Sequence, residues 1–221
     1  IILFNPSLTP AASTEAEILK RQLSPSAVYN FTDAETENLR RFYSHRQYRP
    51  VWIAYESYPS LLETALLILA AADAEGLDSH DYQLPQLQQL RSQANQSPSA
   101  ALELEIRTTH ALLQFAHDLA AGRLSMTAAD PDWHIPRVEF DAVAFLRDAI
   151  ESNRLRQAFE HLPPQKLGYQ QLKQTLMHYR ELAAHNTRWT QIPAAPSIHP
   201  GDTHANIPLI RERIVQAYVA D

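Results

Sequence analysis

Apolar residues recur at intervals of three and four along most of this 221-residue chain, a spacing typical of amphipathic helices. The longest such stretch begins at Ser97 and Pro98, a good N-cap followed by a proline at the first helical position, and ends at Gly122. Its apolar stripe consists of Leu102, Ile106, Thr109, Leu113, Ala116 and Ala120, and Leu112, Phe115 and Leu119 widen it. We therefore predict a long helix that is buried on most of its sides.

Capping residues predict where two further helices begin. Thr32 and Glu35 have the spacing of a capping box, and the helix that they start runs to about His45 with Leu39, Phe42 and Tyr43 on one face. Thr14 and Glu17 have the same spacing and predict a short helix to about Leu23. Residues 1–12 lack a clear period, and we expect an extended arm there.

The remaining periodic segments are also helical and are separated by proline-containing connectors. We predict helices over residues 59–75 (ended by Gly76), 86–94, 141–152, a short one to about 161, 169–184 and 208–219. Only four glycines are present against fifteen prolines, which disfavours hairpins and suits stiff connectors such as residues 126–139. The predicted fold is all-α, an irregular bundle of eight to nine helices.

The domain organisation follows from the proline-rich stretch Trp189–Gly201, which is the best candidate boundary. We assign residues 1–31 to an N-terminal arm and short helix, 32–190 to a helical domain, and 191–221 to a linker and one further helix. A lone amphipathic helix has too little partner surface for a core of its own. It is therefore either the start of a truncated second module or docks back onto the first.

Composition excludes several classes of function. The formal net charge is −6 and the basic residues are dispersed, so we expect no nucleic-acid partner. No apolar run reaches the roughly 18 residues of a membrane span, so we expect none in this chain. The chain contains no cysteine, which removes disulfides, thiolate metal ligands and cysteine nucleophiles. Phosphate-loop and serine-hydrolase motifs are absent as well.

Two histidines on the long helix are the best candidates for a metal site. His110 and His117 are seven residues apart and share a face, and with Asp118 they allow a helical-bundle metalloenzyme as one hypothesis. Ligands for one ion on a helix usually sit three or four residues apart. We therefore favour a structural role in a helix interface and expect neither a metal nor a cofactor.

Acidic residues form two further patterns. Glu103 and Glu105 cannot face each other on a helix, so we predict a solvated or salt-bridged face rather than a pair of catalytic carboxylates. The order of the acids around Gly76 does not fit a calcium loop, so we interpret Gly76 as a helix C-cap followed by a turn that Asp78 or Ser79 caps. Asp118 and Arg123 suggest an ion pair at the end of the long helix.

The basic residues concentrate in one place, where they alternate with aromatic residues. The segment contains Arg40, Arg41, Phe42, Tyr43, Arg46, Tyr48, Arg49 and Trp52. One interpretation is a surface for a glycan or a protein partner, formed by Arg46, Tyr48, Arg49 and Trp52. The other places the aromatic rings in the core, with arginines stacked on them and paired with carboxylates. The acidic balance of the chain favours the second.

Several segments taken in order resemble a known family. They are FYSHRQYRPVW (42–52), AAADAEGLDSHDY (70–82), THALLQFAHDLAAGRL (109–124), LPPQKLGYQQLKQTLMHYRELA (162–183) with Trp189 and the Ile-Pro pair at 192–193, and IHPGD (198–202) before IPLIRERI (207–214). Together they resemble the N-terminal scaffold region of YcbB-type L,D-transpeptidases, over roughly residues 33–214.

The resemblance implies a function in the cell envelope. Members of that family are periplasmic, membrane-anchored or secreted enzymes that cross-link peptidoglycan between meso-diaminopimelate residues. They combine a helical scaffold, a small peptidoglycan-binding domain and a YkuD-type catalytic domain with a cysteine nucleophile. The segment from IHPGD to IPLIRERI resembles the opening of the peptidoglycan-binding module.

This chain departs from the family at its reactive residue. It contains no cysteine and no SxGCxR motif, so no catalytic residue can be carried over and we expect no catalysis by this chain. The expected function is a non-catalytic scaffold that supports peptidoglycan cross-linking or remodelling, with peptidoglycan or a catalytic transpeptidase domain as partner. The alternative is a stand-alone helical periplasmic domain that binds a glycan or a protein.

Overall fold

The computed structural model describes residues 10–24, 29–53, 60–124, 139–185 and 189–218. These residues form helices, turns and connectors without a strand, which confirms the predicted all-α fold. The chain divides into two compact units, residues 1–165 and 166–221, and each is described by itself. The boundary predicted within Trp189–Gly201 falls inside the second unit.

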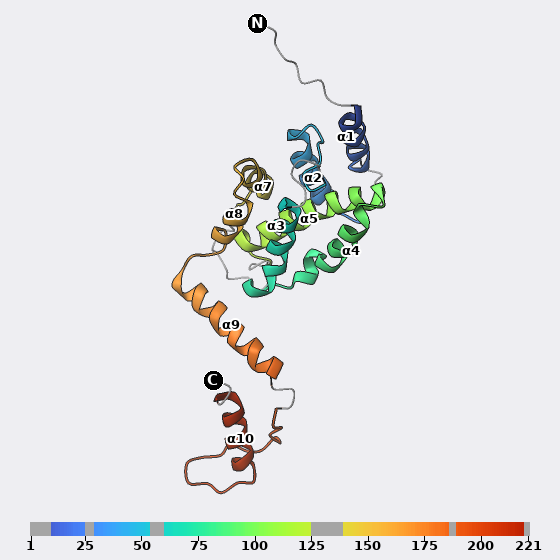
Figure 1. Cartoon of the computed structure of the whole chain (residues 1–221). Coiled ribbons are helices and arrows are strands. Elements are labelled where there is room, and N and C mark those ends of the chain that lie inside the picture. The colour runs from blue at the N-terminus through green and yellow to red at the C-terminus, as the bar shows by residue number, and fades with distance from the viewer. Residues whose placement is uncertain (1–9, 25–28, 54–59, 125–138, 186–188, 219–221) are drawn as a thin grey trace. The chain divides into compact units, whose positions relative to one another are not determined.

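The described residues form nine α-helices and two 3₁₀-helices (Figure 1). The first unit contains α1 (Pro10–Gln22), α2 (Asp33–His45), α3 (Ser60–Ala70), η1 (Ala71–Glu75), η2 (Ser79–Tyr82), α4 (Leu84–Ala94), α5 (Pro98–Ala121), α7 (Ala142–Glu151) and α8 (Leu155–His161). The second unit contains α9 (Leu167–His185) and α10 (Asn206–Tyr218).

Predicted capping residues explain where three of these helices begin. The capping box of Thr32 and Glu35 is present at the start of α2, and the Ser97 hydroxyl accepts a hydrogen bond from the amide of Ala100 at the start of α5. Asp141 caps α7 through the amides of Val143 and Ala144. These side chains satisfy amides that have no partner within the helix.

Two boundary predictions were wrong. Helix α1 begins at Pro10, so residues 10–12 are not part of an extended arm and Thr14 lies inside the helix rather than at its N-cap. A proline suits a first helical position, which explains the earlier start. The segment predicted as helix over 59–75 is an α-helix only to Ala70 and continues as the 3₁₀-helix η1. The predicted connector 126–139 lies outside the described residues except for Glu139.

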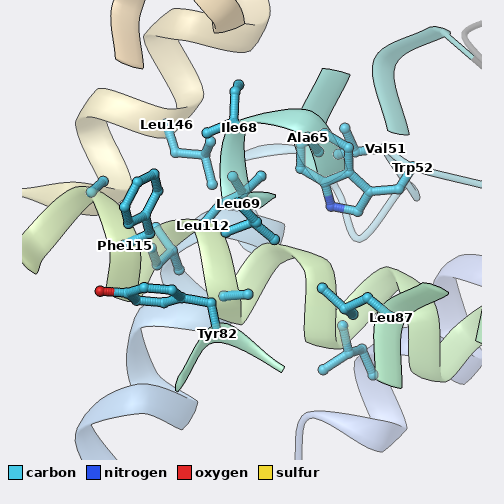
Figure 2. Packing of buried hydrophobic residues seen from close by; sticks show 14 of the residues in the cluster. Val51, Trp52, Ala65, Ile68, Leu69, Tyr82, Leu87, Leu112, Phe115 and Leu146 are labelled. Carbon is cyan, nitrogen blue, oxygen red and sulfur yellow. The ribbon is translucent and has the colours of Figure 1, made fainter. Parts of the chain in front are cut away.

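Helix α5 is the centre of the first unit. Figure 1 shows it between α2, α3, α4 and α7, and its residues contact all four. It is apolar on several sides, so it buries residues against each neighbour, as its sequence predicts. Figure 2 shows the resulting core, with Val51 and Trp52 towards one end and Tyr82 with Phe115 towards the other. The rings of Tyr82 and Phe115 pack edge to face, with their centroids 4.9 Å apart.

The second unit is held together by polar and aromatic contacts around α10. The guanidinium of Arg213 lies 3.8 Å from the centre of the Trp189 ring, and the Thr190 amide donates to Gln216 Oε1. On α9, the predicted apolar face includes Leu172 and Tyr179, which are 70% and 63% exposed. None of the helices that the structure describes combines the length and the apolar character that a membrane crossing requires.

Leucines on the same helix give a matched test of this core. Leu69 of α3 is fully buried, whereas Leu67 is half exposed. We expect Leu69→Ala to lower the free energy of unfolding by about 3 kcal/mol, because it removes buried methyl groups and leaves a cavity. Leu67→Ala should cost less than about 1 kcal/mol. Urea unfolding of both variants checks this, and equal losses would contradict the assignment of the core.

Candidate functional site

The carboxylate of Glu105 lies in the core of the first unit and is 0% exposed. Its Oε1 atom accepts hydrogen bonds from the Val51 amide at 2.7 Å and the Tyr43 hydroxyl at 2.9 Å. Its Oε2 atom accepts from the amides of Trp52 at 2.7 Å and Ile53 at 3.2 Å. Each oxygen therefore accepts two hydrogen bonds, and the total of four is the full capacity of a carboxylate.

A second buried acceptor stands one helical turn further along α5. Thr109 Oγ1 lies 2.8 Å from the indole Nε1 of Trp52 and 2.6 Å from the Tyr43 hydroxyl. We call Tyr43, Val51, Trp52, Glu105 and Thr109 the Glu105 network. It joins α2 and the connector at residues 51–53 to α5, and each of its polar side chains has a partner.

The buried surroundings of the network raise the pKa values of both of its ionisable groups, Glu105 and Tyr43. Burial raises the pKa of Glu105, and the hydrogen bonds from Val51, Trp52 and Tyr43 oppose that rise. Burial and the neighbouring Glu105 carboxylate raise the pKa of the Tyr43 hydroxyl well above its ordinary value of 10.0. Tyr43 therefore stays protonated at neutral pH and can donate to the carboxylate.

The prediction of a solvated or salt-bridged face was right for Glu103 and wrong for Glu105. Glu103 pairs with Arg107 at 2.6 Å, as that prediction requires, but Glu105 is buried. The sequence does carry a signal for the burial of Glu105. Its neighbours Leu104 and Ile106 are apolar and lie on a helix that is predicted to be buried on most sides, and both are fully buried in the structure. An acidic residue at such a position must find donors inside the protein.

The network also corrects the candidate partner surface of Arg46, Tyr48, Arg49 and Trp52. Trp52 is 0% exposed, so it cannot be part of a surface. The aromatic residues Phe42 and Tyr43 are buried too, which agrees with the favoured interpretation of this segment. Arg46 and Tyr48 are half-buried, and Arg49 is exposed. These three residues remain candidates for a surface that contacts a partner.

The two histidines predicted to share a face of α5 both line a pocket of about 780 Å³. The α2 side of this pocket contains Ala34, Glu35, Asn38 and Arg41, the α5 side contains His110, Leu113, Gln114 and His117, and residues 139–142 complete it. Arg41 Nη2 lies 2.6 Å from Asp141 Oδ2 and links α2 to the start of α7 beside the pocket. We call this cavity the α2–α5 pocket.

His110 is the most buried polar residue of the α2–α5 pocket, with 7% of its surface exposed. Its ring stacks on Phe31 at 4.3 Å, and Nε2 lies 3.1 Å from Glu35 Oε1. That contact is close enough for a hydrogen bond from the ring N–H to the carboxylate, and it becomes an ion pair when the ring is protonated. Burial lowers the pKa of His110 below its ordinary value of 6.5, and the nearby Glu35 carboxylate opposes this. The ring is therefore neutral at neutral pH.

A metal site at the histidines finds no geometric support. Within the part of the chain that the structure describes, no group of three or more His, Asp or Glu side chains is arranged to hold a metal ion. The acidic residues around Gly76 behave as predicted: Gly76 has a φ of 79° and caps η1, and Asp78 caps η2. Arg123 lies 3.7 Å from Asp118 Oδ2, which is the predicted ion pair at the end of α5.

Comparison with known proteins gives one match. A family model described as a scaffold domain matches residues 37–176, which is well over half of the chain and includes the Glu105 network. No curated protein and no solved structure matches.

The Glu105 network can be tested with two matched substitutions on α5. In Glu105→Gln an amide NH₂ group replaces one acceptor oxygen and faces backbone donors, so we expect a loss of about 3 kcal/mol in the free energy of unfolding. Glu103→Gln removes only a partly exposed ion pair and should cost about 0.5 kcal/mol. Denaturant unfolding measures both. A Glu105→Gln variant as stable as Glu103→Gln would contradict the structural role of the carboxylate.

The neutral state of His110 predicts a pH dependence of stability. Because its pKa is lowered in the folded state, the unfolded chain binds more protons below about pH 6.5, and stability is lost as the pH falls through that region. The raised pKa of Glu105 acts in the opposite direction above its ordinary 4.5. The comparison must therefore be between variants.

We expect the wild-type chain to lose more stability between pH 7.5 and pH 5.5 than His110→Gln does. The exposed His45 gives the control, because His45→Gln should keep the wild-type dependence. Urea unfolding at several pH values provides the measurement. Identical slopes in the wild type and His110→Gln would show that His110 is not neutral by burial.

Proposed function

Because the chain belongs to the scaffold-domain family, we propose that it is the non-catalytic scaffold of a cell-wall L,D-transpeptidase-like protein. In this role it supports peptidoglycan cross-linking or remodelling in the periplasm or cell envelope. Its partner is peptidoglycan or a catalytic transpeptidase domain. The observation that carries the proposal is the family match over residues 37–176, which lies within the region of roughly residues 33–214 that resembles the YcbB-type scaffold.

The chemistry of the chain supports a non-catalytic role. An L,D-transpeptidase attacks its donor peptide with a cysteine thiolate, and this chain has no cysteine. Its buried carboxylate, Glu105, accepts four hydrogen bonds within the core and has no free lone-pair site for a substrate. The Glu105 network instead fixes the positions of helices, which suits a domain that holds partners in place.

A second candidate is a stand-alone domain that binds a glycan or a protein through Arg46, Tyr48 and Arg49. The backbone favours this display, because Gln47 and Tyr48 adopt left-handed φ values of 55° and 57° directly after α2. Such a turn is held by its surroundings rather than by local preference. The buried residues that follow, Val51 and Trp52, anchor it from the other side.

Sedimentation with isolated sacculi tests the proposal on the 221-residue chain. We expect the chain to pellet with sacculi and to form no cross-linked product from disaccharide tetrapeptides, as judged by chromatography. Arg49→Ala should reduce the pelleted fraction severalfold if the turn after α2 is the contact surface, whereas the exposed Arg156 offers the control Arg156→Ala. Turnover by the purified chain would contradict the proposed function, and a chain that stays in the supernatant would exclude peptidoglycan as its partner and leave the catalytic domain.

A further inference from the structure

The turn that follows α2 contains two arginines whose side chains have no partner. Arg46 and Arg49 form no side-chain hydrogen bond or ion pair with the described residues, and the Nε atom of Arg46 is buried in that state. Two arginines earlier on α2 differ from them, because Arg40 Nε donates to a backbone carbonyl at 2.6 Å and Arg41 pairs with Asp141. The lack of partners is therefore a property of the turn and not of the whole basic segment.

The backbone of this turn brings the two charges close together in a strained conformation. The Arg49 amide donates to the Arg46 carbonyl at 3.1 Å, and a turn closed in this way brings its first and last Cα atoms within about 7 Å. The two central residues, Gln47 and Tyr48, have φ values of 55° and 57°, which favour glycine or asparagine. Like charges placed so close repel each other, and residues 38–55 include no acidic residue to offset them. Strained residues of this kind are typical of binding sites.

A third cation reaches the turn from α1. Lys20 Nζ lies 5.8 Å from the centre of the Tyr48 ring, within the range of a cation–π contact. Lys20 is exposed, and no carboxylate among the described residues pairs with it. We call Lys20, Arg46, Tyr48 and Arg49 the basic turn. It reverses the sign of charge locally in a chain whose formal net charge is −6.

The chemistry of the basic turn favours a partner that carries carboxylates. Guanidinium groups bind carboxylates through two parallel hydrogen bonds. A glycan would need a free aromatic face, but the Tyr48 ring packs against the core and has Lys20 beside it, and Trp52 is fully buried. Residues 29–53 expose no large apolar side chain that could enter a membrane. Arginine and tyrosine on a rigid surface are instead typical of the contacts that dominate protein interfaces.

We propose that the basic turn docks an acidic segment of a protein partner, whose carboxylates pair with Arg46, Arg49 and Lys20. This inference rests on the second candidate function for the surface and names the kind of partner that the surface takes. The turn is already closed by its own hydrogen bond and anchored by the buried residues that follow it. Docking therefore requires little further ordering of this chain.

Fluorescence anisotropy of a labelled, acetylated tetraglutamate peptide with the 221-residue chain provides the test. The comparison peptide has glutamine in place of each glutamate. The negative net charge of the chain disfavours binding of an acidic peptide unless a local cationic surface receives it. We expect the glutamate peptide to bind, the glutamine peptide to bind at least about tenfold more weakly, and the affinity for the glutamate peptide to fall as salt is added.

Matched variants separate the basic turn from a general effect of charge. Arg49→Ala should weaken binding of the glutamate peptide about tenfold, because it removes a charge-assisted hydrogen bond from an exposed position. Lys20→Gln should weaken binding severalfold. Arg156→Ala removes the same charge from an exposed position on α8 and should leave the affinity unchanged. Circular dichroism confirms that the variants fold.

Equal affinity for both peptides, no binding of the glutamate peptide, or no effect of Arg49→Ala would overturn the proposal. Tighter binding to phosphatidylglycerol vesicles than to the peptide, with the same dependence on Arg49, would assign the basic turn to a membrane and overturn it too. Loss of pelleting with sacculi in Arg49→Ala would assign the turn to peptidoglycan instead.

The outcomes also separate this proposal from the proposed function. A chain that pelleted with sacculi but did not bind the glutamate peptide would keep the proposed function and lose the docking surface. A chain that bound the peptide through Arg49 but turned over disaccharide tetrapeptides would keep the docking surface and refute the proposed function.

Discussion

The first unit depends on the hydrogen bonds that the buried Glu105 carboxylate accepts from the connector at residues 51–53. This connector forms a bend, and the described residues contain no strand with which its backbone could pair. Its amides at Val51, Trp52 and Ile53 nevertheless lie in or beside the core, where an unpaired N–H group is costly. The carboxylate satisfies all three, and the hydrogen bond from Tyr43 adds α2 to the same point.

Local chemistry made most of the helices predictable. A cap such as Ser97 or Asp141 satisfies amides within three residues of itself, so its effect can be predicted from a few letters of sequence. The Glu105 network is different, because its donors at Val51 and Trp52 are more than fifty residues away along the chain. Spacing along one helix could exclude a catalytic pair with Glu103, but it could not identify these donors.

The α2–α5 pocket shows the same division between local and distant information. The interval of seven residues correctly placed His110 and His117 on one face of α5, and both line the pocket. The sequence predicted that this face lies in an interface between helices, but it did not identify the residues on the opposite side of the pocket. Glu35 and Arg41 come from α2, and Asp141 from the start of α7, so the charge balance of the pocket exists only in the folded chain.

Helix α5 contributes residues to both the Glu105 network and the α2–α5 pocket, which lie on different sides of it. Glu105 and Thr109 hold α2 and the connector through buried hydrogen bonds, whereas His110, directly after Thr109, faces α2 from the pocket side. Both sites thus depend on how α2 packs against α5, and Tyr43 and Glu35 lie on that same helix α2. The contact between Glu35 and His110 therefore forms across the same α2–α5 interface whose spacing the Glu105 network helps to set.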